Sequence, residues 1–277
     1  MSTLPRWSHI GLGDGRSRCR YSIGASARDI LNVRRNARRN IRKNQAELGT
    51  RFTLLRPGII DYQDAWQLQQ RMADGVRTGA DPALILLEHP LTYTLGVRGK
   101  SEHILLAESA LAARGAAVVR SDRGGDVTFH GPGQIVGYPI LDLRRFSEGP
   151  VWYVRSLEAL LIETLARFGI VADRSPGRPG VWCGDAKIAA IGVRVSRGVT
   201  THGFALNVNT DLSYFDAIVP CGLRDASVTS MQQLAGERFD IYEVQDELID
   251  AFAAQFGFDL MPNTSRRTGI GVVETPA

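Results

Sequence analysis

Cys221 is the first residue whose setting indicates chemistry. It lies between Pro220 and Gly222, a combination typical of a turn and not of a core strand. A thiolate is a strong nucleophile, and the backbone N–H groups beside a glycine are able to face a reacting carbonyl. The setting favours a nucleophilic thiol. The alternative is a small packed side chain, which is the role we expect for Cys183.

Lysine usage is the second unusual feature. Among 33 basic residues only three are lysines, Lys43, Lys100 and Lys187. Lys187 lies in the apolar, strand-like run of residues 186–193, where a charged side chain is costly without a partner. A desolvated amine can lose its proton, whereas a guanidinium cannot. Lys187 is therefore a candidate proton carrier, and a strand-edge lysine with its amine in water is the other interpretation.

A glycine-rich segment could line a ligand pocket. Residues 123–134 read Arg-Gly-Gly-Asp-Val-Thr-Phe-His-Gly-Pro-Gly-Gln, so glycine and proline flank a short strand-like core. Glycine lets a backbone approach a ligand closely, but two tight turns around a strand would have the same composition. The segment matches neither a phosphate-binding loop nor a dinucleotide fingerprint.

Hydrophobic spacing and turn signals predict the elements that must position these residues. Helices are predicted at 61–79, 106–114, 150–169 and 240–256, strands at 83–88, 91–95 and 116–120, and a hairpin at 181–209 that turns at 196–198. Strands and helices alternate without an internal repeat. The sequence therefore predicts one α+β (mixed α/β) domain.

Charge divides the chain unequally. Residues 1–50 contain 11 basic and 3 acidic residues, whereas residues 51–277 contain 22 and 26. We expect a basic, disordered extension at 1–50, a folded domain at 51–261 and a loose tail at 262–277. Because the folded part has no basic surplus, nucleic-acid binding is not favoured. A basic arm for a polyanion, or a transit peptide, is the alternative for the extension.

Composition limits the other possibilities. The hydrophobic share of 44% and the charged share of 22% are ordinary for a globular protein. No run reaches the roughly 18 apolar residues of a membrane span, so we expect no membrane association. Three cysteines leave an odd thiol, which favours a reducing cytoplasm, with a mitochondrial location as the alternative. No metal site is expected, since zinc-binding spacings are missing.

Four ordered motifs resemble those of the lipoyl(octanoyl) transferase family, within the biotin/lipoate protein ligase superfamily. They are Arg-Gly-Gly-x-x-Thr-Phe-His-Gly-Pro-Gly-Gln at 123–134, Lys-Ile-Ala-x-x-Gly at 187–192, His-Gly-x-Ala-Leu-Asn at 202–207 and Pro-Cys-Gly at 220–222. The resemblance covers roughly residues 52–258. It leaves the basic N-terminal segment outside.

The resemblance implies a mixed sheet flanked by helices, the catalytic fold of biotin/lipoate protein ligases. It implies that Cys221 takes an octanoyl group from octanoyl-acyl carrier protein as a thioester, with Lys187 beside it. The acceptor would be a lysine of the lipoyl domains of 2-oxoacid dehydrogenase complexes or of the glycine cleavage H protein, and no cofactor is needed. The residues that match acyl-contacting positions of the family are Arg123, Gly124, Gly125, Asp126, Val127, Thr128, Phe129, His130, Ala190, Ile191, Gly192, Gly203, Phe204 and Ala205.

Three other functions stay open. An ATP-dependent lipoate or biotin ligase on the same fold would activate a free acid and need no thiol. A cysteine thioesterase would use water in place of the acceptor amine, and a non-catalytic protein would bind a polyanion through its Arg-rich arm. We expect His130 and His202 to brace the pocket. Candidate contacts for an acidic carrier protein are Arg98, Lys100, Arg144 and Arg145.

Overall fold

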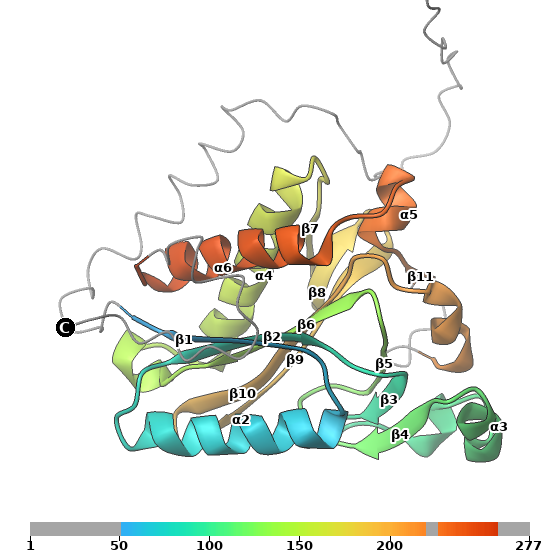
Figure 1. Ribbon diagram of the computed structural model, residues 1–277, viewed down its shortest axis with the longest axis horizontal. Helices are drawn as coiled ribbons and strands as arrows, with labels where there is room; N and C mark the ends of the chain where they lie inside the picture. The colour runs from blue at the N-terminus through green and yellow to red at the C-terminus, as the bar shows by residue number, and fades with distance from the viewer. Residues whose placement is uncertain (1–50, 220–226, 260–277) are drawn as a thin grey trace, which may run out of the picture.

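The structure is a computed structural model that describes residues 51–219 and 227–259. Cys221 and the predicted terminal segments at 1–50 and 262–277 lie outside these ranges. Figure 1 shows the described chain in layers, with a sheet between helices and a smaller sheet at one side. This arrangement confirms the predicted mixed sheet flanked by helices.

The main sheet is mixed and has eight strands among the described residues. In pairing order they are β1 (Thr53–Ile59), β2 (Ala83–Glu88), β6 (Gln134–Ile140), β10 (Val199–Asn207), β9 (Ala186–Ser196), β8 (Arg178–Cys183) and β7 (Asp173–Ser175), with β11 (Ser227–Val228) also beside β9. β1 pairs with β2 and β11 with β9 in parallel, and the other neighbours are antiparallel. Arg197 and Gly198 join β9 to β10 with φ angles of 51° and 83°, which a two-residue hairpin turn of type I′ requires.

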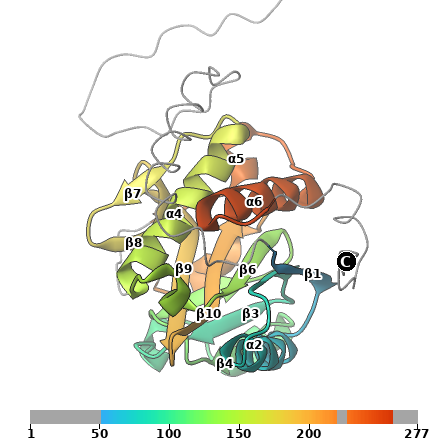
Figure 2. The ribbon, with the colours of Figure 1, turned by 90° about the vertical axis from the view of Figure 1, so that its left-hand side faces the viewer.

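Three long helices cover the main sheet. They are α2 (Tyr62–Arg77), α4 (Pro150–Arg167) and α6 (Ile241–Phe256). Figures 1 and 2 show α4 and α6 on one face of the sheet and α2 on the other. Pro150 begins α4, Asp240 caps α6 with its side chain, and Gly257 ends α6 with a φ of 77°, as these residue types predict. Within the described ranges, no helix is both long and apolar enough to cross a membrane.

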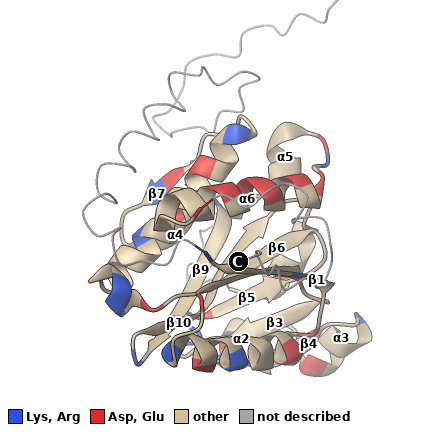
Figure 3. Ribbon diagram, turned by 60° about the vertical axis from the view of Figure 1, so that its left-hand side comes forward, with Lys and Arg blue, Asp and Glu red and all other residues tan. Residues whose placement is uncertain are grey.

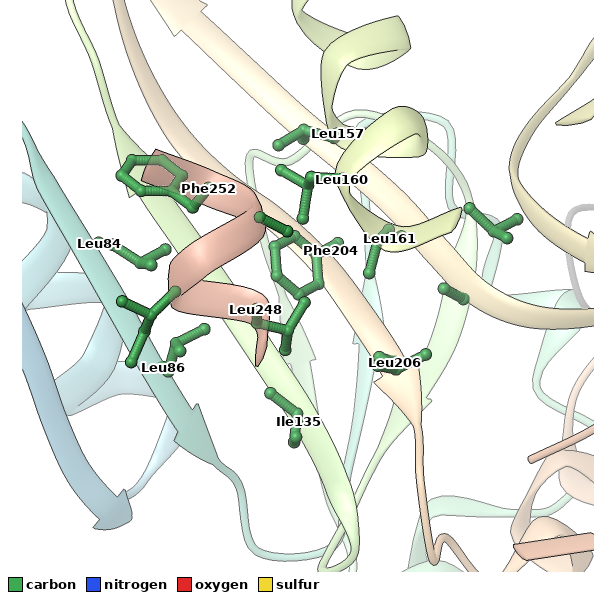
Figure 4. Packing of buried hydrophobic residues seen from close by; sticks show 14 of the residues in the cluster. Leu84, Leu86, Ile135, Leu157, Leu160, Leu161, Phe204, Leu206, Leu248 and Phe252 are labelled. Atoms are coloured by element: carbon green, nitrogen blue, oxygen red, sulfur yellow. The ribbon is translucent and has the colours of Figure 1, made fainter. Parts of the chain in front are cut away.

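Successive side chains along a strand point to opposite faces of the main sheet, so the core has one cluster on each face. On β2, Leu84 and Leu86 pack with α4 and α6, whereas Ile85 and Leu87 belong to the cluster beneath α2. Figure 4 shows Leu84 and Leu86 among side chains of both helices and of β6 and β10. Burial of one such side chain contributes about 1.5–3 kcal/mol. A strand that is apolar on both sides therefore holds the two helical layers together.

A smaller sheet contains β4 (Ala117–Arg120), β3 (Thr92–Leu95) and β5 (Val127–His130) in that order. The sequence predicted strands at 83–88 and 91–95 around one turn, but β2 and β3 belong to different sheets. Pro90 lies between them and cannot donate a hydrogen bond to a strand partner. The short helices are η1 (Ser101–His103), α3 (Glu108–Ala113), η2 (Leu143–Phe146), η3 (Leu212–Ala217) and α5 (Met231–Ala235).

Ion pairs tie α6 to its neighbours. Figure 3 shows acidic residues along α6. Arg167 of α4 lies 3.1 Å from Glu163 and also pairs with Glu247 of α6. Arg56 of β1 pairs with Asp246 of α6 at 2.8 Å. These arginines fix α6 against both α4 and the edge of the sheet.

Candidate active site

A cavity lies over the α2-covered face of the main sheet, where β6, β10 and β9 run side by side. Its floor consists of alternate strand residues: Gln134, Val136 and Tyr138 of β6, Gly203, Ala205 and Asn207 of β10, and Ala190 and Gly192 of β9. The register places Ala205 between Val136 and Ala190. Gly203 lies opposite Gly192. Because glycine and alanine have the smallest side chains, they leave a slot above the strands that a slender apolar group fits.

The glycine-rich segment provides another wall. The predicted site residues that line the cavity are Arg123, Gly125, Asp126, Val127, Thr128, His130, Lys187, Ala190, Ile191, Gly192, Gly203, Phe204 and Ala205. Gly124 instead donates its N–H to the carbonyl oxygen of Val193 at 3.0 Å. Phe129 packs into the neighbouring core, with its ring stacked 4.8 Å from that of Tyr214. Contact of Gly124 or Phe129 with a substrate stays a prediction.

A β-bulge turns Lys187 toward the cavity. The register between β9 and β8 shifts at this point and leaves Ile188 out of the pairing. Ile188 and Ala189 are adjacent, yet both are buried in the core cluster that includes α4 and α6. A bulge of this kind reverses the alternation of a strand. Lys187 therefore lines the same cavity as Ala190.

The stem of Lys187 is half-buried between two strands. Its Nζ lies 4.8 Å from the centroid of the Trp182 ring on β8, a cation–π distance. A Cβ at Gly180 would lie 2.6 Å from the carbonyl oxygen of Ala189, so the glycine lets β8 approach β9 closely beside the Lys187 stem. On the other side, Lys187 pairs with Val228 of β11, and the N–H of Thr229 donates to the carbonyl oxygen of Lys187 at 2.9 Å.

The described residues on either side of Cys221 reach the cavity. Before it, Phe215 lines the cavity, and the N–H of Val219 donates to the carbonyl oxygen of His103 at 2.8 Å. After it, Val228 lines the cavity. Segments that precede and follow Cys221 in the sequence therefore both contribute to the cavity lining.

Arg123 organises the glycine-rich wall from within. The residue is only 7% exposed. Its guanidinium donates to the carbonyl oxygens of Thr94, Gly124 and Asp126 at 2.6, 3.0 and 2.7 Å, and to the hydroxyl oxygen of Thr94 at 2.9 Å. Five N–H donors in a rigid fork suit this task, which a lysine could not perform. The wall is therefore held by backbone carbonyls gathered around one arginine.

Two buried histidines near this wall are neutral. His89 donates from Nδ1 to the carbonyl oxygen of Ile60 at 2.9 Å, so its Nε2 accepts from the hydroxyl of Tyr138 at 2.7 Å. Burial lowers the pKa of His89 to about 4. Burial, together with His89 and Arg123 nearby, holds the pKa of His130 well below its ordinary value. This part of the site therefore carries no imidazolium charge.

His202 is fixed through both its backbone and its ring. Its φ of 57° is unusual for a residue with a Cβ, and its N–H donates to the side-chain oxygen of Gln69 at 2.7 Å. Its Nε2 donates to Asp122 at 2.7 Å. This bond lowers the pKa of Asp122, whereas burial lowers that of His202. The contacts support a bracing role. In the described part of the chain, no group of three or more His, Cys, Asp or Glu is placed to hold a metal.

The neutral histidines predict a loss of stability in mild acid. The unfolded chain binds a proton on His89 below about pH 6.5, but the folded chain does so only below about pH 4. Unfolding therefore takes up protons between these values, and the free energy of unfolding falls as the pH falls, by about 3 kcal/mol from His89 alone. Denaturant titrations at several pH values should show that the free energy of unfolding falls less steeply with falling pH in His89→Gln than in the wild type. An equal decline of the free energy of unfolding with pH in the wild type and in His89→Gln would contradict the lowered pKa of His89.

Three buried polar residues of the site were not singled out from the sequence: Thr94, Gln134 and Asn207. Gln134 and Asn207 are the last residues of two of the four motifs. Their place in these motifs was the sequence signal that could have identified them as site residues. Thr94 lies in a short buried strand without a motif, so its contacts with Arg123 and His130 could be found only from the fold.

A family model for the lipoyl protein ligase A/B catalytic domain matches residues 61–253. The chain belongs to this family. The fold agrees, since the solved structure of a lipoate-protein ligase A bound with ATP superposes with a TM-score of 0.61 at 18% identity, covering 78% of this chain and 89% of that one.

Closer relatives define the activity within the family. The octanoyltransferase of Solibacter usitatus is 51% identical over 75% of this chain and 94% of its own length. That of Chloroflexus aggregans is 49% identical over 76% of this chain and 96% of its own length. The protein is therefore an acyltransferase that transfers octanoyl groups, as the four motifs implied.

Proposed function

We propose that the enzyme moves an octanoyl group from acyl carrier protein to a lysine of a lipoyl domain through a thioester on Cys221, assisted by Lys187. The observation that carries the proposal is the bulge that turns Lys187 into the alanine- and glycine-floored cavity. β11, the next strand after Cys221 among the described residues, pairs with Lys187. The acceptors would be lipoyl domains of 2-oxoacid dehydrogenase complexes and the glycine cleavage H protein.

The first half-reaction exchanges one thioester for another. The Cys221 thiolate attacks the carbonyl carbon of the octanoyl thioester, and the carrier sulfur leaves as a thiolate, which takes up the proton of the Lys187 ammonium. A neighbouring ammonium lowers the pKa of a cysteine, so the charge of Lys187 would favour the reactive thiolate. The octanoyl chain would lie along the slot above Ala190 and Ala205.

The second half-reaction forms the amide. The acceptor amine attacks the carbonyl carbon of the octanoyl-Cys221 thioester, and the Cys221 sulfur leaves as a thiolate. Lys187, once deprotonated, would accept the proton that the attacking amine loses. Both steps run from a thioester to an equally or more stable product, so the reaction would need no ATP.

Transfer without ATP is the test of this function. Octanoyl-acyl carrier protein and a lipoyl domain should give an octanoylated lysine in the absence of ATP, which mass spectrometry detects. A strict requirement for free octanoate and ATP would instead identify a ligase. Release of free octanoate at the same rate with and without the lipoyl domain would identify a thioesterase.

Ala205 offers a test of the slot. It is 5% exposed in the cavity floor, and leucine there would project three more carbons into the space above the sheet. We expect Ala205→Leu to lower kcat/KM with an octanoyl donor by about 10–200-fold, and with a butanoyl donor much less. Ala205→Ser adds one oxygen and is the matched control, with near wild-type preference. An equal loss of kcat/KM with the octanoyl and butanoyl donors in a folded variant would show that Ala205 does not contact the acyl chain.

A further inference from the structure

A continuous line of buried hydrogen bonds runs from the glycine-rich wall toward the middle of the cavity floor. Arg123 donates from Nε to the hydroxyl oxygen of Thr94 at 3.1 Å. That hydroxyl lies 3.3 Å from Nε2 of His130. Nδ1 of His130 lies 2.8 Å from the side-chain oxygen of Gln134. All four residues are at most 7% exposed.

The same line continues to the backbone of Lys187. The amide nitrogen of Gln134 donates to the side-chain oxygen of Asn207 at 2.9 Å. Asn207 donates from Nδ2 to the carbonyl oxygen of Thr229 at 3.0 Å. Thr229 in turn donates its N–H to the carbonyl oxygen of Lys187 at 2.9 Å. Asn207 thus links the cavity floor to Thr229, the residue after β11, whose N–H is bonded to the backbone of Lys187.

The direction of each hydrogen bond is determined by the groups available. Arg123 has only donors, so the hydroxyl of Thr94 accepts from it and is free to donate to His130. His130 is neutral, so it donates from Nδ1 and accepts at Nε2. Gln134 then uses its oxygen toward His130 and its nitrogen toward Asn207. The side-chain oxygen of Asn207 therefore faces Gln134, and its amide nitrogen faces the carbonyl oxygen of Thr229.

We propose that Asn207 is a positioning residue, which holds β11 and Lys187 in register so that the lysine amine stays within reach of the Cys221 sulfur. The inference rests on the proposed roles of Lys187 and Cys221. Without the Asn207 amide, the carbonyl oxygen of Thr229 loses a buried donor, and the two-residue strand β11 loses its side-chain link to β10. A displacement of about 1 Å at a reacting group can cost on the order of 100-fold in rate.

Asn209 provides a matched control two residues further along. Asn209 is 8% exposed and, like Asn207, uses its side chain both as donor and as acceptor. It donates to the carbonyl oxygen of Phe239 at 2.8 Å and accepts from the N–H of Phe239 at 3.0 Å. These bonds hold the loop before α6 and do not lead to Lys187. Leucine has nearly the shape of asparagine and adds no charge. Asn207→Leu and Asn209→Leu therefore remove similar bonds at different places.

The experiment measures the pH dependence of Cys221 alkylation by iodoacetamide, resolved by peptide mass spectrometry, together with transfer kinetics. For Asn207→Leu we expect the apparent pKa of Cys221 to rise by about half a unit or more. We also expect kcat to fall by about 10–100-fold, with KM for the octanoyl donor changed less than about twofold. Asn209→Leu should lower the melting temperature comparably and leave the thiol pKa and kcat near wild type.

Lys187→Met in the same assay separates the two proposals. If Lys187→Met raises the thiol pKa but Asn207→Leu does not, the positioning role is overturned and the proposed function stands. If Lys187→Met leaves the thiol pKa unchanged, the proposed activation of Cys221 by Lys187 fails, and the positioning role that depends on it fails as well. Should Asn207→Leu not fold, Asn207→Ala, which removes the same bonds without adding bulk, is measured in its place. Equal kinetic losses in the Asn207 and Asn209 variants would also overturn the positioning role.

Discussion

Cys221→Ala should abolish octanoyl transfer to a lipoyl domain, with a loss in kcat of at least about 10⁴-fold. The reason is chemical, since no other group in the proposed reaction can carry the acyl chain between donor and acceptor. The measurement is the rate of octanoyl-lysine formation, with circular dichroism and melting temperature as the test of folding. Because Cys221 lies between Pro220 and Gly222, a combination typical of a turn and not of a core strand, we expect the melting temperature to change little.

Cys183→Ala is the control for Cys221→Ala. Cys183 is 4% exposed and belongs to the core cluster beneath α4 and α6. Its replacement should cost stability, because a buried sulfur is removed, and should leave kcat within about twofold of wild type. A large loss of kcat in folded Cys183→Ala, with Cys221→Ala active, would exchange the roles of the two thiols.

Lys187→Met should lower kcat by about 10²–10⁴-fold, the usual contribution of a positioned proton carrier. Methionine keeps the unbranched stem beside Trp182 but removes both the charge and the proton acceptor. Lys187→Arg keeps the charge and cannot release its proton. We therefore expect Lys187→Arg to retain acylation of Cys221 better than transfer to the acceptor, which single-turnover measurements of each half-reaction would show.

Lys100→Met is the matched control for the lysine. The side chain of Lys100 is 66% exposed and pairs with Glu102 at 3.3 Å. A surface pair of this kind contributes little to stability. The variant should have wild-type kcat, because Lys100 as a candidate carrier-protein contact would affect only the KM for the donor. Full activity of Lys187→Met would show that the amine facing the cavity has no part in the chemistry.

Much of the architecture could be predicted because local signals agree with the fold. Pro150, Asp240 and Gly257 mark helix ends in the sequence and in the structure. The β9–β10 hairpin turns where Arg197 and Gly198 predict it. Such signals act within a few residues, so the fold as a whole does not alter them. The assignment of β2 and β3 to different sheets depends on long-range pairing, which spacing cannot indicate.

The site could be predicted as a set of motifs but not as a geometry. Spacing placed Lys187 in an apolar strand, where its direction was undetermined. The bulge at Ile188 decides that direction, and it arises from the pairing of β9 with β8. The contact of Asn207 with Thr229 likewise joins residues that are distant in the sequence. The motifs resembled a family, and the fold gives the physical reason why their residues act together.

Trapping the acyl-enzyme is the most direct test of the central claim. The wild-type protein is incubated with octanoyl-acyl carrier protein alone, quenched in acid, digested and examined by mass spectrometry. We expect one octanoyl group on the Cys221 peptide, which hydroxylamine removes and which disappears when a lipoyl domain is added before quenching. An octanoyl group on the Cys183 peptide, or full transfer to the lipoyl domain with no acylated cysteine, would contradict it.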